Sequence, residues 1–365
     1  MNVFTVIYLA SFLMACVNYI LNISLALFLA QVKQAGPFII GLAGFTGNVA
    51  FTAGTLLLAR YSQRKKTSVF IYVPAGIALL YLLIRFSPMP LIFLFLFIAG
   101  ALYAFFWPAV QRCFKEPGDE LHIGIYNLAW SGGVICGAFS AGMLYALNYT
   151  APFITAFILS ACAFFLIVLS RAELLALNKY SEKEESEKRL PAETVKEVRL
   201  LNFLHFFAAS SIFFLYPKLG LERGFSPQFI GSAAGILLIC RFVVFSLLID
   251  KPMIMHPARF IISCFLFFVS CCLTGLGGQP YAVIAGVAIL GASGAVSYHN
   301  SLLMHIKHGL KTEIHESIIG MGALSGALVT GLLGQILNLP VAFVLVGAGI
   351  LLAGVWHSRK YLSRR

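Results

Sequence analysis

The chain alternates between long apolar runs and short polar gaps along almost its whole length. A helix needs about 20 predominantly apolar residues to cross the hydrocarbon core of a bilayer. Because twelve runs are about this long, the pattern predicts an all-α polytopic membrane protein with 12 transmembrane helices. The expected spans are residues 3–31, 37–59, 67–86, 89–111, 122–147, 150–171, 198–219, 227–249, 258–277, 280–306, 313–337 and 340–358.

The second half of the chain repeats the first. Three glycines recur at a constant offset of 189 residues, as the pairs Gly133 and Gly322, Gly137 and Gly326, and Gly142 and Gly331. A Pro-x-x-Ile-Gly segment also recurs, from Pro37 and from Pro227, at an offset of 190. We therefore expect two pseudo-symmetric six-helix bundles, residues 1–171 and 198–365, joined by a cytoplasmic linker over residues 172–197. In transporters, such duplicated bundles enclose the substrate path.

Composition supports a membrane location. Hydrophobic residues make up 60% of the chain, charged residues only 11%, and the mean hydropathy is +0.90. Soluble globular proteins carry about 25% charged residues. The net charge of +12 does not indicate nucleic-acid binding, because the basic residues lie in the gaps between apolar runs rather than on a polar domain.

The same basic residues orient the protein. With a cytoplasmic N-terminus, 21 Lys and Arg residues fall in inside loops and the tail, and four fall in outside loops. Positive residues favour the cytoplasmic side. We therefore expect an integral protein of the plasma (inner) membrane, with both termini, including a short basic C-terminal tail, in the cytoplasm.

These features together resemble the major facilitator superfamily. That family carries a signature between its second and third helices, with a Gly, an Asp-Arg pair and a basic cluster that help to lock the cytoplasmic side. Here Ala59 stands at the Asp position and Ser62 at the Gly position, whereas Arg60 and Arg64 are retained. The second half has Asp250 at the equivalent place. The resemblance implies transport by alternating access and a cytoplasmic gate that contains Arg60, Arg64 and Asp250.

Glu316 is the leading candidate for proton coupling. Polar groups inside hydrocarbon are costly, so those that persist point to function. Of the fourteen Asp and Glu residues, only Glu316 starts inside an apolar run. Coupling needs a group that changes charge, which a carboxyl group or a histidine does, and His299 is the second candidate. The alternative is an acid at a helix N-terminus near the interface, where the helix dipole favours it.

Arg241 is the second charged residue inside an apolar run. A buried guanidinium needs an anion. Three interpretations remain open: a structural ion pair with Glu316, contact with a carboxylate or phosphate of the substrate, or extension of the side chain to the interface.

The remaining polar residues within the spans complete a predicted binding wall. Asn18 and Asn22 are four residues apart and so share one helix face. The first half offers neutral and aromatic groups and the second half offers charge, which suits an amphipathic substrate with one ionised end. The predicted substrate-binding residues are Arg241, Asn18, Asn22, Trp107, Asn127, Trp130, His205, His299 and Asn300.

No motif indicates an enzyme. The chain has no Walker loop, no GxSxG and no HExxH. His305 and His308 have no third ligand at a suitable spacing. We expect no cofactor and no metal, and the expected partners are a small solute, lipid and protons. The leading function is secondary active transport of a small solute, as a symporter or antiporter. The alternatives are export of drugs, amphipathic metabolites or lipids, and a sensor or scaffold without transport.

Overall fold

The computed structural model describes residues 2–60, 70–114, 120–177, 191–248, 257–307 and 312–362, and every regular element in these ranges is a helix. The helices are α1 Val3–Gln31, α2 Pro37–Arg60, η2 Phe70–Tyr72, α3 Val73–Phe86, α4 Met89–Arg112, α5 Glu120–Leu147, α6 Ala151–Leu169, α7 Arg171–Leu177, α8 Ala192–Glu222, α9 Pro227–Leu248, α10 Pro257–Leu276, α11 Pro280–Lys307, α12 Thr312–Ile336 and α13 Leu339–Leu362. Within the described ranges, eleven helices are long and apolar enough to cross a membrane.

Proline marks several helix starts. α2, α9, α10 and α11 each begin at a proline. The first N–H groups of a helix have no partner within the helix, so proline, which lacks an N–H, is tolerated there. A proline at the start of an apolar run is therefore compatible with a helix that begins there.

Two elements differ from the sequence prediction. The span expected at 67–86 is described as a short turn, η2, followed by α3, in which Pro74 occupies the first turn. The 14-residue α3 is too short to cross a bilayer alone. α8 begins at Ala192, directly after Pro191, so it starts inside the range expected to be linker.

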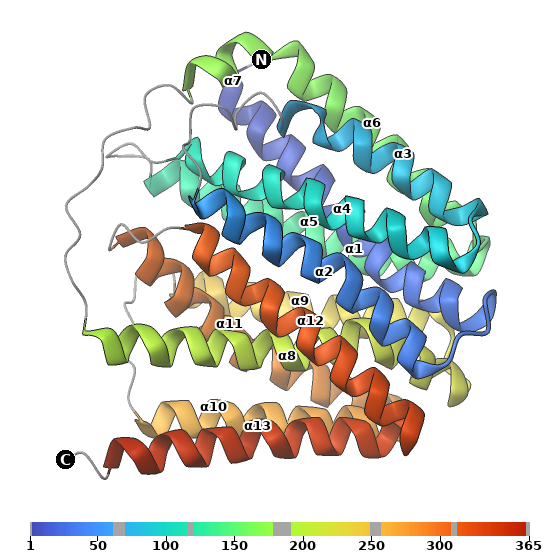
Figure 1. Ribbon diagram of the computed structural model, residues 1–365, viewed down its shortest axis with the longest axis vertical. Helices are drawn as coiled ribbons and strands as arrows, with labels where there is room; N and C mark the ends of the chain where they lie inside the picture. The colour runs from blue at the N-terminus through green and yellow to red at the C-terminus, as the bar shows by residue number, and fades with distance from the viewer. Residues whose placement is uncertain are drawn as a thin grey trace.

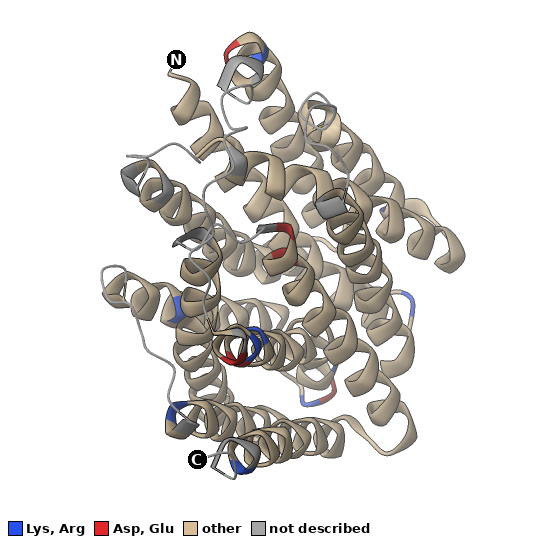
Figure 2. Ribbon diagram, turned by 60° about the vertical axis from the view of Figure 1, so that its left-hand side comes forward, with Lys and Arg blue, Asp and Glu red and all other residues tan. Residues whose placement is uncertain are grey.

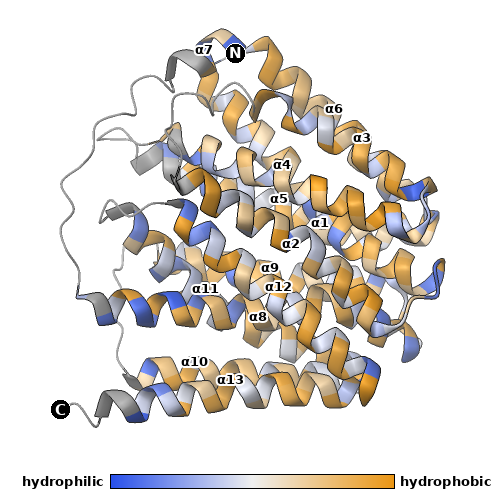
Figure 3. Cartoon of the chain, in the orientation of Figure 1, coloured by the Kyte–Doolittle hydropathy of each residue, from blue (hydrophilic) through white to orange (hydrophobic). Residues whose placement is uncertain are grey.

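The two halves of the chain occupy different parts of the molecule. Helices α1–α6, here called the N-terminal half, form the upper part of Figure 1, and α8–α13, the C-terminal half, form the lower part. Hydrophilic residues gather at the helix ends and apolar residues cover the middle (Figure 3). Charged residues are few (Figure 2), and large apolar side chains such as Leu169 and Leu352 are exposed, as expected for a lipid-facing surface.

The repeated glycines make equivalent contacts within each half. A Cβ on Gly133 would collide with the carbonyl oxygen of Phe12 on α1, and one on Gly322 would lie 2.5 Å from that of Phe203 on α8. Gly137 and Gly326 repeat the contact one turn further along, against Cys16 and Phe207. The absence of side chains lets these helix backbones touch.

The third glycine of each set joins the two halves. Gly142 on α5 packs against Pro227 and Gly231 on α9, so that a Cβ on Gly231 would lie 2.7 Å from the amide nitrogen of Gly142. Gly331 on α12 packs in the same way against Pro37 and Gly41 on α2, where an added Cβ would lie 2.7 Å from the carbonyl oxygen of Pro37. The two copies of the sequence repeat thus form two equivalent contacts between the halves.

Candidate functional site

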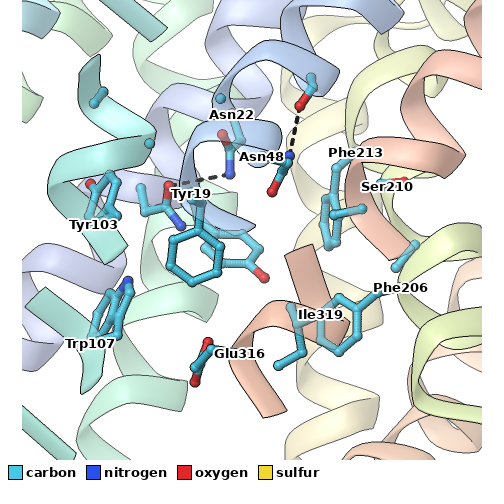
Figure 4. Close-up of a pocket in the computed structure, with 18 of the residues that line it drawn as sticks. Tyr19, Asn22, Asn48, Tyr103, Trp107, Phe206, Ser210, Phe213, Glu316 and Ile319 are labelled. Carbon is cyan, nitrogen blue, oxygen red and sulfur yellow. Dashed lines mark hydrogen bonds between the residues drawn. The ribbon is translucent and has the colours of Figure 1, made fainter. Parts of the chain in front are cut away.

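A cavity of about 190 Å³ lies between the two halves. The N-terminal half supplies most of its wall, and α8, α11 and α12 supply the rest. In Figure 4, Tyr103 and Trp107 lie on one side and Phe206 and Phe213 on the other, with the carboxyl group of Glu316 at one end. The lining residues are Asn18, Tyr19, Asn22, Leu25, Ala43, Gly44, Gly47, Asn48, Phe51, Tyr81, Leu96, Ala99, Gly100, Tyr103, Trp107, Gln111, Tyr126, Asn127, Trp130, Phe206, Ala209, Ser210, Phe213, Phe214, Tyr298, Glu316, Ile319 and Ala323.

One stripe of α4 carries three of the polar groups. Tyr103, Trp107 and Gln111 follow one another at intervals of four residues and therefore lie on one helix face. The rings of Tyr103 and Trp107 are stacked, with centroids 6.3 Å apart and planes 4° apart. Of these three residues, only Trp107 was among the predicted substrate-binding residues.

Amide side chains line another part of the wall. Nδ2 of Asn22 donates to Oδ1 of Asn18 at 3.5 Å, as their shared helix face predicts. Nδ2 of Asn48 donates to the carbonyl oxygen of Gly44, one turn earlier on α2, at 2.8 Å. Asn127 on α5 also faces the cavity. These amides can present both donors and acceptors to a bound solute.

Glu316 is the only Asp, Glu, Lys, Arg or His residue among the described lining residues. Its side chain is 8% exposed. Nε2 of Gln111 donates to Oε1 of Glu316 at 2.8 Å, and this hydrogen bond joins α4 to α12 across the two halves. No basic side chain in the described wall balances the carboxylate, so the charge of the cavity depends on whether Glu316 carries a proton.

Arg241 lies behind the wall rather than on it. Its side chain, 5% exposed, places the guanidinium carbon 5.1 Å from the ring centroid of Trp130 and 5.7 Å from that of Tyr298. These two rings, from α5 and α11, are stacked 5.9 Å apart and both line the cavity. In the described part of the chain no carboxylate lies within ion-pair distance of Arg241. The ion pair with Glu316, one of the three interpretations left open by the sequence, is therefore absent, and the guanidinium packs against two aromatic rings.

The other predicted residues of the C-terminal half also lie outside the cavity wall. His205 is completely buried, against the rings of Phe206 and Phe267, and neither of its ring nitrogens has a hydrogen-bond partner within the described structure. His299 packs edge-on against Phe245 at 5.2 Å, and Asn300 is buried. The structure therefore brings Asn18, Asn22, Trp107, Asn127, Trp130 and Glu316 together in the cavity wall, and Arg241, His205, His299 and Asn300 are buried but do not line it.

A separate polar cluster lies at one end of the C-terminal half. Nδ1 of His305 approaches the carbonyl oxygen of Ser301 at 2.7 Å, and Nε2 of His305 approaches Arg199 at 3.4 Å. A carbonyl only accepts and a guanidinium only donates, so these two contacts suit a neutral His305 with its proton on Nδ1. The hydroxyl of Ser301 also meets Nδ1 of His315 at 2.9 Å. The cluster ties α8, α11 and α12 together.

The expected cytoplasmic gate falls largely outside the described residues. Arg64 and Asp250 lie outside them, and Arg60 is the last residue of α2, where its side chain is not described. Sequence reasoning also missed Gln111, Tyr126, Phe206 and Phe213, which line the cavity. Among the residues placed by the structure, no three His, Cys, Asp or Glu side chains are grouped so that they could hold a metal ion.

Comparison with known proteins gives one family match and many structural matches. The sequence profile of the Major Facilitator Superfamily matches residues 7–313. Comparison with curated proteins gives no match. The nucleoside transporter NupG is 14% identical with a TM-score of 0.71, and the alignment covers 100% of this chain and 99% of that one. A POT family transporter in complex with 5-aminolevulinic acid is 12% identical with a TM-score of 0.72, covering 96% and 94%. The human organic anion transporter MFSD10 is 15% identical with a TM-score of 0.59, covering 98% of each chain. At these identities the likeness shows the fold alone.

Proposed function

Since the chain belongs to the Major Facilitator Superfamily, we propose that it is a secondary active transporter that moves a small solute by alternating access and couples it to protons. In this arrangement η2 and α3 complete a twelfth span, so that each half contributes six helices. Both termini lie in the cytoplasm, and the protein resides in the plasma (inner) membrane. The cavity between the halves supports this proposal, because a solute held there contacts both halves at once.

One observation carries the coupling proposal: the only charged side chain in the described cavity wall bonds across the two halves. An ionised carboxylate in an apolar, aromatic cavity is costly unless a positive partner accompanies it. Binding or releasing a proton at Glu316 changes both the charge of the cavity and the role of the Gln111 hydrogen bond. Glu316 therefore belongs both to the solute site and to a contact between the halves. A group in this position is suited to couple proton binding to solute movement.

The first-half residues of the wall are proposed as solute contacts. Asn18, Asn22 and Asn127 offer amide groups, and Trp107 and Trp130 offer ring faces. Arg241, His205, His299 and Asn300 support the wall from behind, so their substitution acts through the shape of the cavity. The solved relatives are named for nucleosides, peptides and organic anions, which differ chemically, so the shared fold does not name the solute.

The test is solute-driven proton movement in proteoliposomes. Vesicles that contain the purified protein and a trapped pH-sensitive dye would receive uridine, dialanine, 5-aminolevulinic acid or tryptamine in separate experiments. We expect at least one solute to change the internal pH, and Glu316→Gln to abolish the change while leaving solute exchange. Glu313→Gln is the matched control, because Glu313 is buried one turn away on α12 but does not line the cavity. Solute binding without any flux would favour a sensor and overturn the proposal.

A further inference from the structure

We propose that the solute is an organic monocation, an amine on an aromatic or aliphatic frame, and that its ammonium group takes the place of the proton on Glu316. This inference rests on the proposed transport function, because it assigns a substrate class to the same cavity.

The charges of the wall favour a cation. The described lining residues include one carboxyl group, several neutral amides and phenols, and no Lys, Arg or His. An organic anion would meet Glu316 and no compensating base, which leaves like charges together in a site of low polarity. A neutral solute would require Glu316 to keep its proton, so it could not exchange with that proton. A monocation satisfies the carboxylate and adds no net charge to the cavity.

The aromatic rings of the wall are suited to the same ligand. Ammonium groups are attracted to the faces of Trp and Tyr rings within about 6 Å. The protein already holds one cation in this way, since the guanidinium of Arg241 lies over Trp130 and Tyr298 at 5.1 and 5.7 Å. Trp107 and Tyr126 line the cavity as well, and no cation within the described residues lies over either ring. These two rings are therefore available to a cation bound at Glu316.

Arg241 does not offer an anion site to the solute in this arrangement. The stacked pair of Trp130 and Tyr298 stands in the cavity wall, and Arg241 lies behind it. An anion would have to separate two packed rings from different halves to reach the guanidinium. A cation requires no such rearrangement.

Among the titratable groups near Glu316, Glu316 itself is the one that exchanges a proton for the amine. Tyr126 on α5 and Tyr298 on α11 lie within electrostatic range, and Glu313 lies one turn away on α12. α4 presents the neutral Gln111. The lining residues from α1, α2 and α8 are neutral amides, a serine, a tyrosine and apolar side chains. Phenols remain neutral over the ordinary pH range, so competition between proton and amine takes place at Glu316.

The exchange is balanced in charge. When an ammonium ion enters from one side, the proton on Glu316 leaves to water on that side. When the ammonium ion leaves on the other side, a proton from that side returns to Glu316. One monocation therefore moves against one proton, no other bond forms or breaks, and no net charge crosses the membrane.

A set of isosteric probes tests the inference. Tryptamine, tryptophol and indole-3-acetate share one ring system and end in an ammonium, a hydroxyl and a carboxylate group, and phenethylamine, 2-phenylethanol and phenylacetate form a smaller set. The thermal stability of the purified protein in detergent would be measured with each at pH 6 and pH 8. We expect at least one amine to stabilise, and more strongly at pH 8, where fewer protons compete. A ligand that binds only the folded protein raises its melting temperature.

Two variants test whether the amine binds at Glu316. Glu316→Gln should weaken the apparent affinity for the amine about tenfold or more, because a charge-assisted hydrogen bond is lost. Glu313→Gln should change the affinity far less, because Glu313 does not line the cavity. Any one of three results would overturn the inference. The amine and its alcohol could stabilise the protein equally, Glu316→Gln could bind the amine as tightly as the unchanged protein does, or neither amine could stabilise the protein. If uridine or dialanine drives proton flux through Glu316 and the amines do not, the transport function stands and the cation inference falls. If no solute of the panel moves, the transport function itself falls.

Discussion

Asn127 on α5 and Glu316 on α12 occupy equivalent positions of the duplicated halves, 189 residues apart, and both line the same cavity. The offset is the one that relates Gly133 to Gly322. The repeat therefore delivers two polar side chains to one cavity from opposite halves. One of the two is a neutral amide and the other is a carboxyl group, so of the two positions only that of Glu316 can exchange charge.

Asn127→Ala should weaken solute binding without uncoupling protons. A neutral hydrogen bond contributes about 1 kcal/mol, so we expect the apparent KM to rise about three- to tenfold. The number of protons moved per solute should stay the same. The measurement is the concentration dependence of solute-driven pH change in proteoliposomes. Leu128→Ala is the control, because Leu128 is the next residue on α5 and is half exposed. A loss of coupling in Asn127→Ala would contradict the assignment of charge exchange to Glu316 alone.

Trp130 and Arg241 should be energetically coupled. In a double-mutant cycle with Trp130→Leu and Arg241→Met, we expect an interaction energy of about 1–2 kcal/mol, as for a desolvated cation–π contact. The single change Arg241→Met should cost little, because a buried charge without a carboxylate partner is itself expensive. The free energies of unfolding would be measured in mixed micelles with increasing SDS. An interaction energy near zero would mean that the guanidinium does not depend on Trp130.

Gly142→Ala should destabilise the contact between the halves. A Cβ at this position would collide with the carbonyl oxygen of Pro227, and backbone cannot rotate away as a side chain can. Overpacking of this kind costs about 1–3 kcal/mol. Gly349→Ala on α13 is the matched control, because no atom lies within 4 Å of its added Cβ. The check is the melting temperature of each variant in detergent, and equal temperatures for the two would argue against the contact.

Arg223 should stabilise the end of α10 strongly. Nη1 of Arg223 donates to the carbonyl oxygens of Thr274 at 3.0 Å and Gly277 at 2.7 Å, and Nη2 donates to that of Gly275. The last carbonyls of a helix lack partners within the helix. We expect Arg223→Met to cost about 2–3 kcal/mol, since hydrogen bonds to charged groups are strong.

Lys218→Met is the comparison for Arg223. Lys218 pairs with the half-exposed Glu222 at 3.1 Å, a surface contact that contributes well under about 1 kcal/mol. Thermal unfolding of both variants would show the difference. A similar loss in the two would mean that the carbonyl contacts of Arg223 contribute no more than an ordinary surface charge.

The sequence allowed most helix positions to be predicted, because lipid imposes a minimum length on each apolar run. α1 was expected at 3–31 and is found at Val3–Gln31. The repeated glycines lie where helix backbones touch, since glycine in a membrane helix permits close packing. Of the span expected at 67–86, the described residues form η2 and then α3, which begins at Val73 with Pro74 in its first turn.

The candidate site was harder to predict. Gln111 stands at the end of an apolar run, where a polar residue is ordinary, and only the position of α12 across the halves gives it a partner. Arg241 was expected to need an anion, but the rings of Trp130 and Tyr298 come from two other helices and provide the contact. Contacts between distant helices depend on the rotation of each helix about its axis, which hydrophobic periodicity defines poorly in a helix that is apolar on all sides.

The glycine contacts between the halves are reciprocal. α5 of the first half receives Pro227 and Gly231 of the second, and α12 of the second receives Pro37 and Gly41 of the first. Two identical subunits related by a two-fold axis make this kind of isologous interface, in which each partner gives and receives the same surface. The chain thus keeps, inside one polypeptide, the interface of a symmetric dimer. Each half carries the complementary surface for its counterpart, so two separately synthesised halves have the means to recognise each other without a covalent connection.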